Sequence, residues 1–220
     1  MSGNFLENNC TSLSGKISSK PVFSHEIYGE GFYLVRVEVS RLSDTYDIIP
    51  VIFSERLLPI EEFIPGRLVT VEGQFRSYNN YNNETNHKLM LTVFARDIVL
   101  MEGSDEVKVP NSIFLNGFIC KKPIYRTTPF GREIADLLLA VNRAYNKSDY
   151  IPCIAWGRNA RFASHFEIGD NLKIWGRIQS RQYQKKFQDG TVEDRTAFEV
   201  SISKMEISKD SNNAHKDDEE

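Results

Sequence analysis

The chain has 220 residues, of which 40% are hydrophobic, and a formal net charge of −3 at pH 7. The length favours two domains over one, and the hydrophobic fraction excludes a largely disordered chain. No apolar run approaches the ~18 residues of a membrane-spanning helix, and the first ten residues lack the basic and apolar regions of a secretory signal.

The net charge hides an uneven distribution. Residues 1–106 carry 9 basic and 15 acidic side chains, residues 107–207 carry 16 and 10, and residues 208–220 carry 2 and 5. The second segment therefore has a net charge of +6, between segments of −6 and −3. A basic module of this kind favours a polyanionic partner, although two ordinary solvated surfaces would give the same arithmetic.

The sequence offers little chemistry for catalysis. Cys10, Cys120 and Cys153 form no CxxC pair and the four histidines are scattered, so neither a zinc site, a disulfide framework nor any cofactor is predicted. Cys153 lies in an apolar run and is expected to be a small buried hydrophobe. No phosphate-cradling glycine loop and no nucleophile–base spacing is present, which predicts that the protein is not an enzyme.

The chain contains an internal repeat. A displacement of 102 residues aligns identical residue types in the two halves, namely Gly15 with Gly117, Lys20 with Lys122, Asp47 with Asp149 and Pro50 with Pro152. A displacement of 103 aligns Gly66 with Gly169, Gly73 with Gly176 and Ser77 with Ser180. The predicted organisation is an N-terminal segment at 1–11, a first domain at 12–103, a linker at 104–111, a second domain at 112–207 and a disordered acidic tail at 208–220.

In chain order, the second copy shows five segments with the pattern of strands: Ile113–Ile119, Ile134–Tyr145, Tyr150–Trp156, Leu172–Tyr183 and Phe198–Ile207. A short helix is expected at 159–166, closed by Gly169, and turns are expected at Gly131 and Asp189–Gly190. Five strands with a short helix before the fourth are typical of the OB-fold barrel. With the repeat, the predicted fold is all-β: two tandem five-stranded OB-fold barrels, each with a short helix.

Alternation along the fourth of these strands separates an apolar face from a mixed one. The mixed face carries Lys173, Trp175, Arg177, Gln179, Arg181 and Tyr183, and Lys185 and Lys186 follow it. Single-stranded nucleic acid suits such a face, because cations pair with phosphates while bases stack on the rings. A subunit interface that buries Trp175 and Tyr183 is the alternative.

The preceding strands extend this face. Tyr150, Trp156 and Arg158 lie on one side of their strand, whereas small residues such as Cys153 and Ala155 lie on the other, where a narrow barrel interior would accommodate them. Tyr145, flanked by Arg143 and Lys147, ends the strand before. The alternative for Trp156 is a place in the hydrophobic core.

Four segments in this order, 137–145, 150–160, 169–183 and 189–200, resemble the bacterial single-stranded DNA-binding protein family. The resemblance implies an OB fold and binding of single strands without sequence preference. It places stacking aromatics at Tyr145, Tyr150, Trp156 and Tyr183, and backbone-contacting cations at Arg143, Arg158, Arg177 and Arg181. The full candidate set comprises Tyr145, Tyr150, Trp156, Tyr183, Trp175, Arg143, Lys147, Arg158, Arg177, Arg181, Lys185, Lys186, Lys121 and Lys122.

The first copy lacks these aromatics. Its positions that align with the four stacking residues are Ser43, Ile48, Ser54 and Asn80. It is also the acidic half, so we expect a structural, dimerising or protein-binding barrel rather than a complete DNA site. Tyr78 and Tyr81, in the Asn-rich stretch 77–87, are alternative stacking residues, although this stretch has the composition of a flexible polar hairpin.

The predicted function is sequence-independent binding of single-stranded DNA in replication, recombination or repair, in the bacterial cytoplasm near the nucleoid. Because members of the resembled family commonly place four OB domains around one DNA, a homodimer is expected. The family often ends in an acidic segment with a Pro-Phe tip that recruits replication and repair proteins, whereas this sequence ends in Glu219–Glu220. An OB-fold protein-interaction or replication-restart factor with weak DNA or RNA affinity is the alternative.

Overall fold

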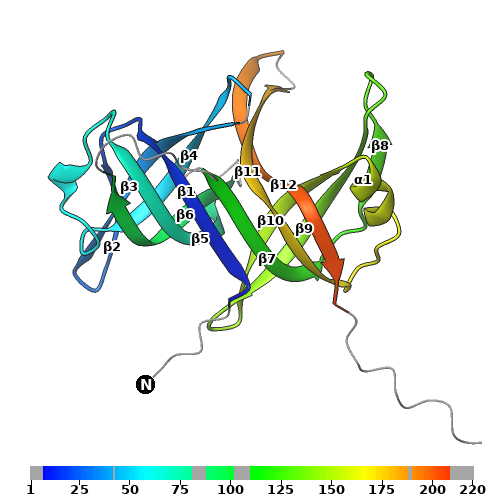
Figure 1. The fold of residues 1–220 in the computed structure, drawn as a ribbon, viewed down its shortest axis with the longest axis horizontal. Coiled ribbons are helices and arrows are strands. Elements are labelled where there is room, and N and C mark those ends of the chain that lie inside the picture. Colours follow the sequence, from blue (N-terminus) through cyan, green and yellow to red (C-terminus); the bar gives the residue numbers. More distant parts are fainter. Residues whose placement is uncertain (1–6, 42, 81–87, 102–109, 188–189, 209–220) are drawn as a thin grey trace, which may run out of the picture.

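The computed structural model describes residues 7–41, 43–80, 88–101, 110–187 and 190–208, and nearly all of them lie in β-strands or in the turns between strands. Figure 1 shows two barrels side by side, one from each half of the chain. The first half forms β1 (Asn9–Ile17), β2 (Val22–Ile27), β3 (Glu30–Ser40), β4 (Tyr46–Ser54), β5 (Leu68–Asn80) and β6 (Lys88–Leu100). The second half forms β7 (Asn111–Ile119), β8 (Ile124–Thr127), β9 (Glu133–Arg143), β10 (Lys147–Trp156), β11 (Asn171–Lys186) and β12 (Val192–Ile207).

Both barrels are closed by the same pairings. In the first, β3, β4, β6, β5 and β1 follow one another, and an additional β1–β3 pairing closes the ring. In the second, β9, β10, β12, β11 and β7 do the same, and β7–β9 closes it. The β4–β6 and β10–β12 pairs are parallel. The predicted five-stranded OB-fold barrels are thus confirmed, and β2 and β8 add a strand to the outer side of β3 and β9.

The hydrophobic alternation of the strands accounts for the barrel interiors. Val35, Val37 and Val39 on β3 are buried, as are Leu137, Leu139 and Val141 on β9, while intervening residues face outward. β-branched and large apolar side chains of this kind fit the half-buried surface of a strand. Each barrel therefore has its core inside the ring, and the outer faces remain for contacts with other molecules.

The helices differ between the two copies. The second barrel has α1 (Arg158–Ala163), which is shorter than the predicted 159–166 and buries Ala160 and Ala163. In the first barrel the short helix is a 3-10 turn of three residues, η1 (Ile60–Glu62), rather than an α-helix. Pro59 and Pro65 lie on either side of this turn. Because proline cannot donate a backbone hydrogen bond and restricts the residue before it, too few residues remain between them for an α-helix.

The two barrels are joined by strand pairing. β1 pairs antiparallel with β7, from Asn9 opposite Leu115 to Leu13 opposite Asn111, so that one sheet runs through the molecule. β1 begins at Asn9, inside the predicted N-terminal segment. β5 continues as a strand to Asn80, so residues 77–80 are not part of a loop, and Tyr81 lies outside the described residues. In the described part of the chain, no helix is long and apolar enough to cross a membrane.

Candidate nucleic-acid interface

Strand β10 presents aromatic side chains to solvent. Tyr150 and Trp156 are 48% and 39% exposed, whereas Ile151, Cys153 and Ala155, which alternate with them, are buried. The prediction that small residues face the interior is confirmed, as is the burial of Cys153. Trp156 is not a core residue.

The neighbouring outer surface belongs to the long β11–β12 hairpin, which rises above the junction of the barrels in Figure 1. Tyr183 on β11 is 37% exposed, and the Arg181 guanidinium lies 5.8 Å from its ring centroid. Glu199 on β12 places a negative charge among the cations of this surface. Its carboxylate lies 3.8 Å from the Arg181 side chain and accepts a 2.8 Å hydrogen bond from Gln179. Gln179 is therefore buried, although the sequence alternation predicted it on the open face.

Strand register brings these side chains into one surface. Ser201 on β12 pairs with Ile154 on β10 and with Arg177 on β11, so the three residues form one row across the sheet. β10 runs parallel to β12, and β11 runs antiparallel to β12. Tyr150 therefore lies on the same side of this row as Arg181 and Tyr183. Trp156 lies on the opposite side of the row. The aromatic rings are thus spread along one face of the second barrel.

Tyr145 lies in the turn between β9 and β10. Its side chain is 94% exposed, and both Tyr145 and Asn146 have positive φ angles, of 62° and 53°. Residues other than glycine rarely adopt this backbone conformation, so the turn holds the ring outward at some cost in conformational energy. Arg143 and Lys147 pair across the strands that flank the turn.

Trp175 differs from the other predicted aromatics because its ring is already in contact within the chain. The Phe114 ring lies 5.1 Å away, centroid to centroid, and the Lys204 ammonium lies 4.5 Å from the centroid of Trp175. The residue is half-buried. The structure therefore places Trp175 against β7 and β12 rather than on a fully open surface.

The remaining predicted cations are dispersed. Arg158 is exposed at the start of α1, and Lys186 is exposed at the end of β11. The Lys185 ammonium lies 5.0 Å from the ring centroid of Phe187. The Arg177 guanidinium donates to Gln179 at 3.2 Å. Lys121 and Lys122 are exposed after β7, and the Lys122 ammonium lies 3.8 Å from the Glu167 carboxylate, in the loop after α1.

Two buried aspartates connect the barrels reciprocally. Asp47 on β4 accepts hydrogen bonds from the backbone N–H of Ser180 on β11 at 2.6 Å and from its hydroxyl at 2.9 Å. Asp149 on β10 accepts from the backbone N–H of Ser77 on β5 at 2.8 Å. Both carboxylates are 0% exposed. The repeat predicted the Asp47–Asp149 and Ser77–Ser180 correspondences, and the structure shows that these residues form the inter-barrel contact.

An arginine pairs with each aspartate, but the two carboxyl groups titrate differently. Burial raises the pKa of Asp47, yet hydrogen bonds from Arg41, at 2.8 and 2.5 Å, and from Ser180 hold it below its ordinary value. Burial also raises the pKa of Asp149, and there the 3.3 Å contact with Arg143 and the bonds from Ser77 do not offset it. Among the described atoms, Asp149 Oδ2 is buried without a hydrogen-bond partner.

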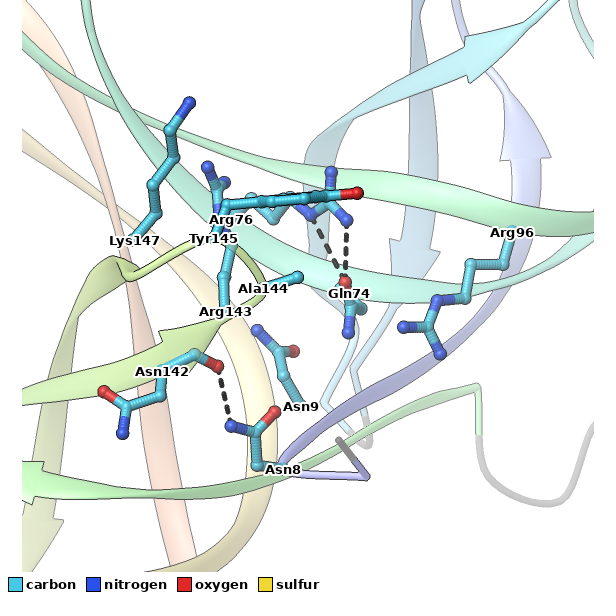
Figure 2. A pocket seen from close by; sticks show the side chains of 10 residues that line it. All are labelled: Asn8, Asn9, Gln74, Arg76, Arg96, Asn142, Arg143, Ala144, Tyr145 and Lys147. Atoms are coloured by element: carbon cyan, nitrogen blue, oxygen red, sulfur yellow. Dashed lines mark hydrogen bonds between the residues drawn. The ribbon is translucent and has the colours of Figure 1, made fainter. Parts of the chain in front are cut away.

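A cavity of 300 Å³ lies beside this junction. Figure 2 shows that it draws side chains from both barrels. The lining residues are Asn8, Asn9, Gln74, Arg76 and Arg96 from the first half and Asn142, Arg143, Ala144, Tyr145 and Lys147 from the second. Three of the predicted site residues, Arg143, Tyr145 and Lys147, therefore meet here.

Sequence reasoning missed the first-barrel members of this cavity. Arg76 and Arg96 lie in the acidic half, where regional charge argued against a polyanion site. The Arg76 guanidinium donates to Gln74 at 2.8 Å and lies 4.1 Å from the ring centroid of Phe94. Burial and the positive charges of Arg143 and Arg96 lower the pKa of Arg76 to about 10. The sequence feature that could have pointed to Arg76 as a cavity residue is its position next to Ser77, which the repeat aligns with Ser180.

The first barrel shows no comparable aromatic face at the aligned positions. Ile48 is exposed on β4, while Ser54 is buried with its hydroxyl bonded to Glu30. The Ser43 hydroxyl lies 2.9 Å from that of Thr45. Neither serine offers a ring on which a base could stack.

Comparison with solved structures shows the fold over both barrels. A deletion mutant of the single-stranded DNA binding protein from Thermus aquaticus aligns with 94% of this chain and 98% of that chain, at a TM-score of 0.73 and 21% identity. The wild-type protein aligns with 91% of this chain and 92% of that one, at a TM-score of 0.71. At this identity the likeness concerns the fold alone.

Sequence comparison with curated proteins covers about a third of the chain. A segment of 81 residues is 36% identical to Single-stranded DNA-binding protein 2 of Listeria innocua and covers 34% of this chain and 51% of that protein. A segment of 88 residues is 36% identical to the Single-stranded DNA-binding protein of Clostridium tetani and covers 37% of this chain and 59% of that protein. The chain thus spans about half the length of the curated relatives it matches.

A family model matches the second half of the chain. Residues 110–208 match the model of the Single-strand binding protein family. These residues are the ones that form β7 to β12 and carry the exposed aromatic side chains. The resemblance predicted from four sequence segments is confirmed, because residues 110–208 match the model of that family.

Proposed function

We propose that the protein binds single-stranded DNA without sequence preference, through the outer face of the second barrel. The observation that carries the proposal is the set of four solvent-exposed rings, Tyr145, Tyr150, Trp156 and Tyr183, on the barrel that matches the family. Exposed aromatic side chains lose the stability that burial would give, so a surface with several of them favours a role in binding.

The binding surface combines stacking with charge. Each base that stacks on a ring contributes about 1–3 kcal/mol, largely irrespective of its identity, which gives affinity without sequence preference. Arg181 beside Tyr183, and Arg143 and Lys147 beside Tyr145, are placed to pair with phosphates next to a stacked base. Arg158, Arg177, Lys185, Lys186, Lys121 and Lys122 belong to the proposed surface as further cations. Trp175 lies at its margin, because Phe114 and Lys204 already contact its ring.

The cellular role that fits this chemistry is protection of single strands during replication, recombination or repair in the bacterial cytoplasm. We also propose that two chains associate, because a dimer would arrange four OB barrels around one DNA. The acidic first barrel would then serve mainly in assembly.

The stacking assignment is tested with the variant Trp156→Ala/Tyr183→Ala. We expect the affinity for labelled oligo-dT, measured by fluorescence anisotropy, to fall by about thirtyfold or more, because two stacking rings at about 1–3 kcal/mol each contribute at least about 2 kcal/mol together. The control is Tyr28→Ala, which removes a fully exposed ring from the first barrel. Equal affinities of the double variant and the wild type would refute the stacking assignment.

A further inference from the structure

The cavity between the barrels collects positive charge from both. Arg76 on β5 and Arg96 on β6 line it from the first barrel, and Arg143 and Lys147 line it from the second. In Figure 2 the Lys147 ammonium points away from Asn8, Asn9 and Gln74. Of the described residues that line it, none is Asp or Glu. Cations that converge on a hollow raise the local concentration of anions there. The chemistry of the lining therefore selects a negatively charged ligand.

The neighbouring carboxylate neutralises this charge only in part. Asp149 lies behind the lining, 3.3 Å from Arg143, and its contacts are shared with the backbone and hydroxyl of Ser77. The Arg76 guanidinium instead contacts a neutral amide, Gln74, and the face of Phe94. A guanidinium held on neutral groups retains its capacity to pair with a phosphate.

The position of Tyr145 indicates which anion fits. Its ring is almost fully exposed and belongs to the lining of the same cavity. A ring beside a group of cations matches one nucleotide of a single strand, with the base on the ring and the phosphate among the cations. The amide side chains of Asn8 and Asn9 lie at the same hollow and add polar groups from the start of the chain.

We propose that this cavity is a phosphate site through which a single DNA strand passes from the second barrel onto the first, with Arg76 and Arg96 as the first barrel's contacts. The inference deepens the proposed function and rests on it. It assigns the first barrel a part in DNA binding without base stacking, which neither its regional charge nor its missing aromatics suggested.

The two sides of the junction, which the repeat relates to each other, carry different side chains. Under the 103-residue displacement, Arg76 corresponds to Gln179 and Gln74 to Arg177. Glu199, whose carboxylate accepts a hydrogen bond from Gln179, corresponds to Arg96 under the same displacement, so the second side of the junction has an acidic residue in place of a cation. The strand is therefore expected to cross at the Arg76 side.

The test is the salt dependence of oligo-dT binding by the full chain and by Arg76→Gln/Arg96→Gln. If both arginines contact phosphates, the slope of log affinity against log salt concentration becomes shallower by about 1.4 in the double variant and by about 0.7 in Arg96→Gln. The quenching of aromatic fluorescence at saturation remains as in the wild type, because the stacking rings are intact. Arg76→Lys/Arg96→Lys keeps the charges and retains most of the slope.

The control is Arg36→Gln/Arg56→Gln, which makes the same charge change at exposed positions of the first barrel outside the cavity lining. A wild-type slope in this control together with a shallower slope in the cavity variants supports the site. Wild-type slopes in Arg76→Gln/Arg96→Gln and in Arg96→Gln would overturn the proposed phosphate site and leave the proposed function standing. If loss of Arg76 prevents folding, the exposed Arg96 decides the question alone. Absence of oligo-dT binding by the wild type would contradict the proposed function itself.

Discussion

Single residues in strained positions link the stability of this protein to its proposed binding. Tyr145 and Tyr28 both have positive φ angles, of 62° and 50°, and both side chains project into solvent. Strain of this kind persists where the surrounding structure determines the backbone, and it often marks a functional position. Tyr145 lines the inter-barrel cavity, whereas Tyr28 lies in the β2–β3 turn of the first barrel.

We predict that Tyr145→Gly weakens DNA binding without lowering the stability of the fold. Glycine adopts positive φ without steric cost, so the free energy of unfolding should stay unchanged or rise by up to about 1 kcal/mol. Affinity for oligo-dT should fall, because one stacking ring is lost. Urea unfolding and anisotropy titration measure the two effects. Tyr28→Gly should reproduce the first effect without the second, and an equal loss of affinity in both variants would contradict the role of Tyr145.

At the scale of elements, closure of each barrel depends on a glycine that the repeat duplicates. The pairing of β5 with β6 and of β11 with β12 shifts register at Gly73 and Gly176, and an irregularity of this kind bends a strand. A Cβ atom at Gly73 would lie 2.3 Å from the carbonyl oxygen of Phe94, and one at Gly176 would lie 2.2 Å from that of Ser201. These approaches to backbone leave no room for a side chain.

We predict that Gly176→Ala destabilises the second barrel by about 2 kcal/mol or more, since the strands must separate to admit a methyl group. Gly31→Ala is the matched control, because its Cβ would meet the end of the flexible Glu55 side chain, which can move. Thermal unfolding followed by circular dichroism compares the two. A smaller loss for Gly176→Ala than for Gly31→Ala would contradict this explanation of the bend.

The reciprocal aspartates make the junction between elements sensitive to acid. The pKa of Asp47 is lowered in the folded state, so Asp47 contributes stability above its unfolded pKa of about 3.9, and this is lost as the pH falls. The pKa of Asp149 is raised, so its ionised form opposes folding, and protonation relieves this as the pH falls. The two groups therefore act with opposite signs, Asp149 at pH values just above the unfolded pKa of about 3.9 and Asp47 at pH values below it.

We predict that the loss of unfolding free energy between about pH 7 and about pH 3 is smaller in Asp47→Asn than in the wild type and larger in Asp149→Asn. Each asparagine retains an oxygen that accepts the bonds from the serine of the other barrel, so the fold is preserved. Urea titrations at the two pH values supply the comparison. The same acid sensitivity in both variants would show that these carboxyl groups do not have the opposed shifts described above.

The fold was predictable because the repeat and the strand alternation are local features of sequence. Tyr150, Trp156 and Tyr183 were found in the same way, since alternation predicts the face of a strand. Arg76 and Arg96 were not, because their importance depends on β1–β7 pairing, which brings side chains from the two halves of the chain to one cavity. Gln179 was misplaced because its partner Glu199 lies on another strand. Composition summed over a domain also concealed two cations on an acidic barrel.

For the whole molecule, the pair of joined barrels is half of the proposed assembly. We predict that sedimentation equilibrium gives a dimer of the 25.3 kDa chain. The β1–β7 ladder already uses one sheet edge of each barrel within the chain, so the second chain must associate through another surface. A 25.3 kDa monomer that binds oligo-dT tightly would contradict the proposed dimer and leave the binding surface unaffected.

The central claim, that the second barrel's aromatic and basic face binds single-stranded DNA, is tested most directly by titrating the full chain with oligo-dT at several salt concentrations. We predict binding that quenches the intrinsic fluorescence and weakens with salt, with a log–log slope of about −0.7 for each phosphate contact. Duplex DNA of the same length should compete poorly, because its bases are not free to stack on the exposed rings. Binding that is absent, or equally strong for duplex and single strand, would contradict the claim.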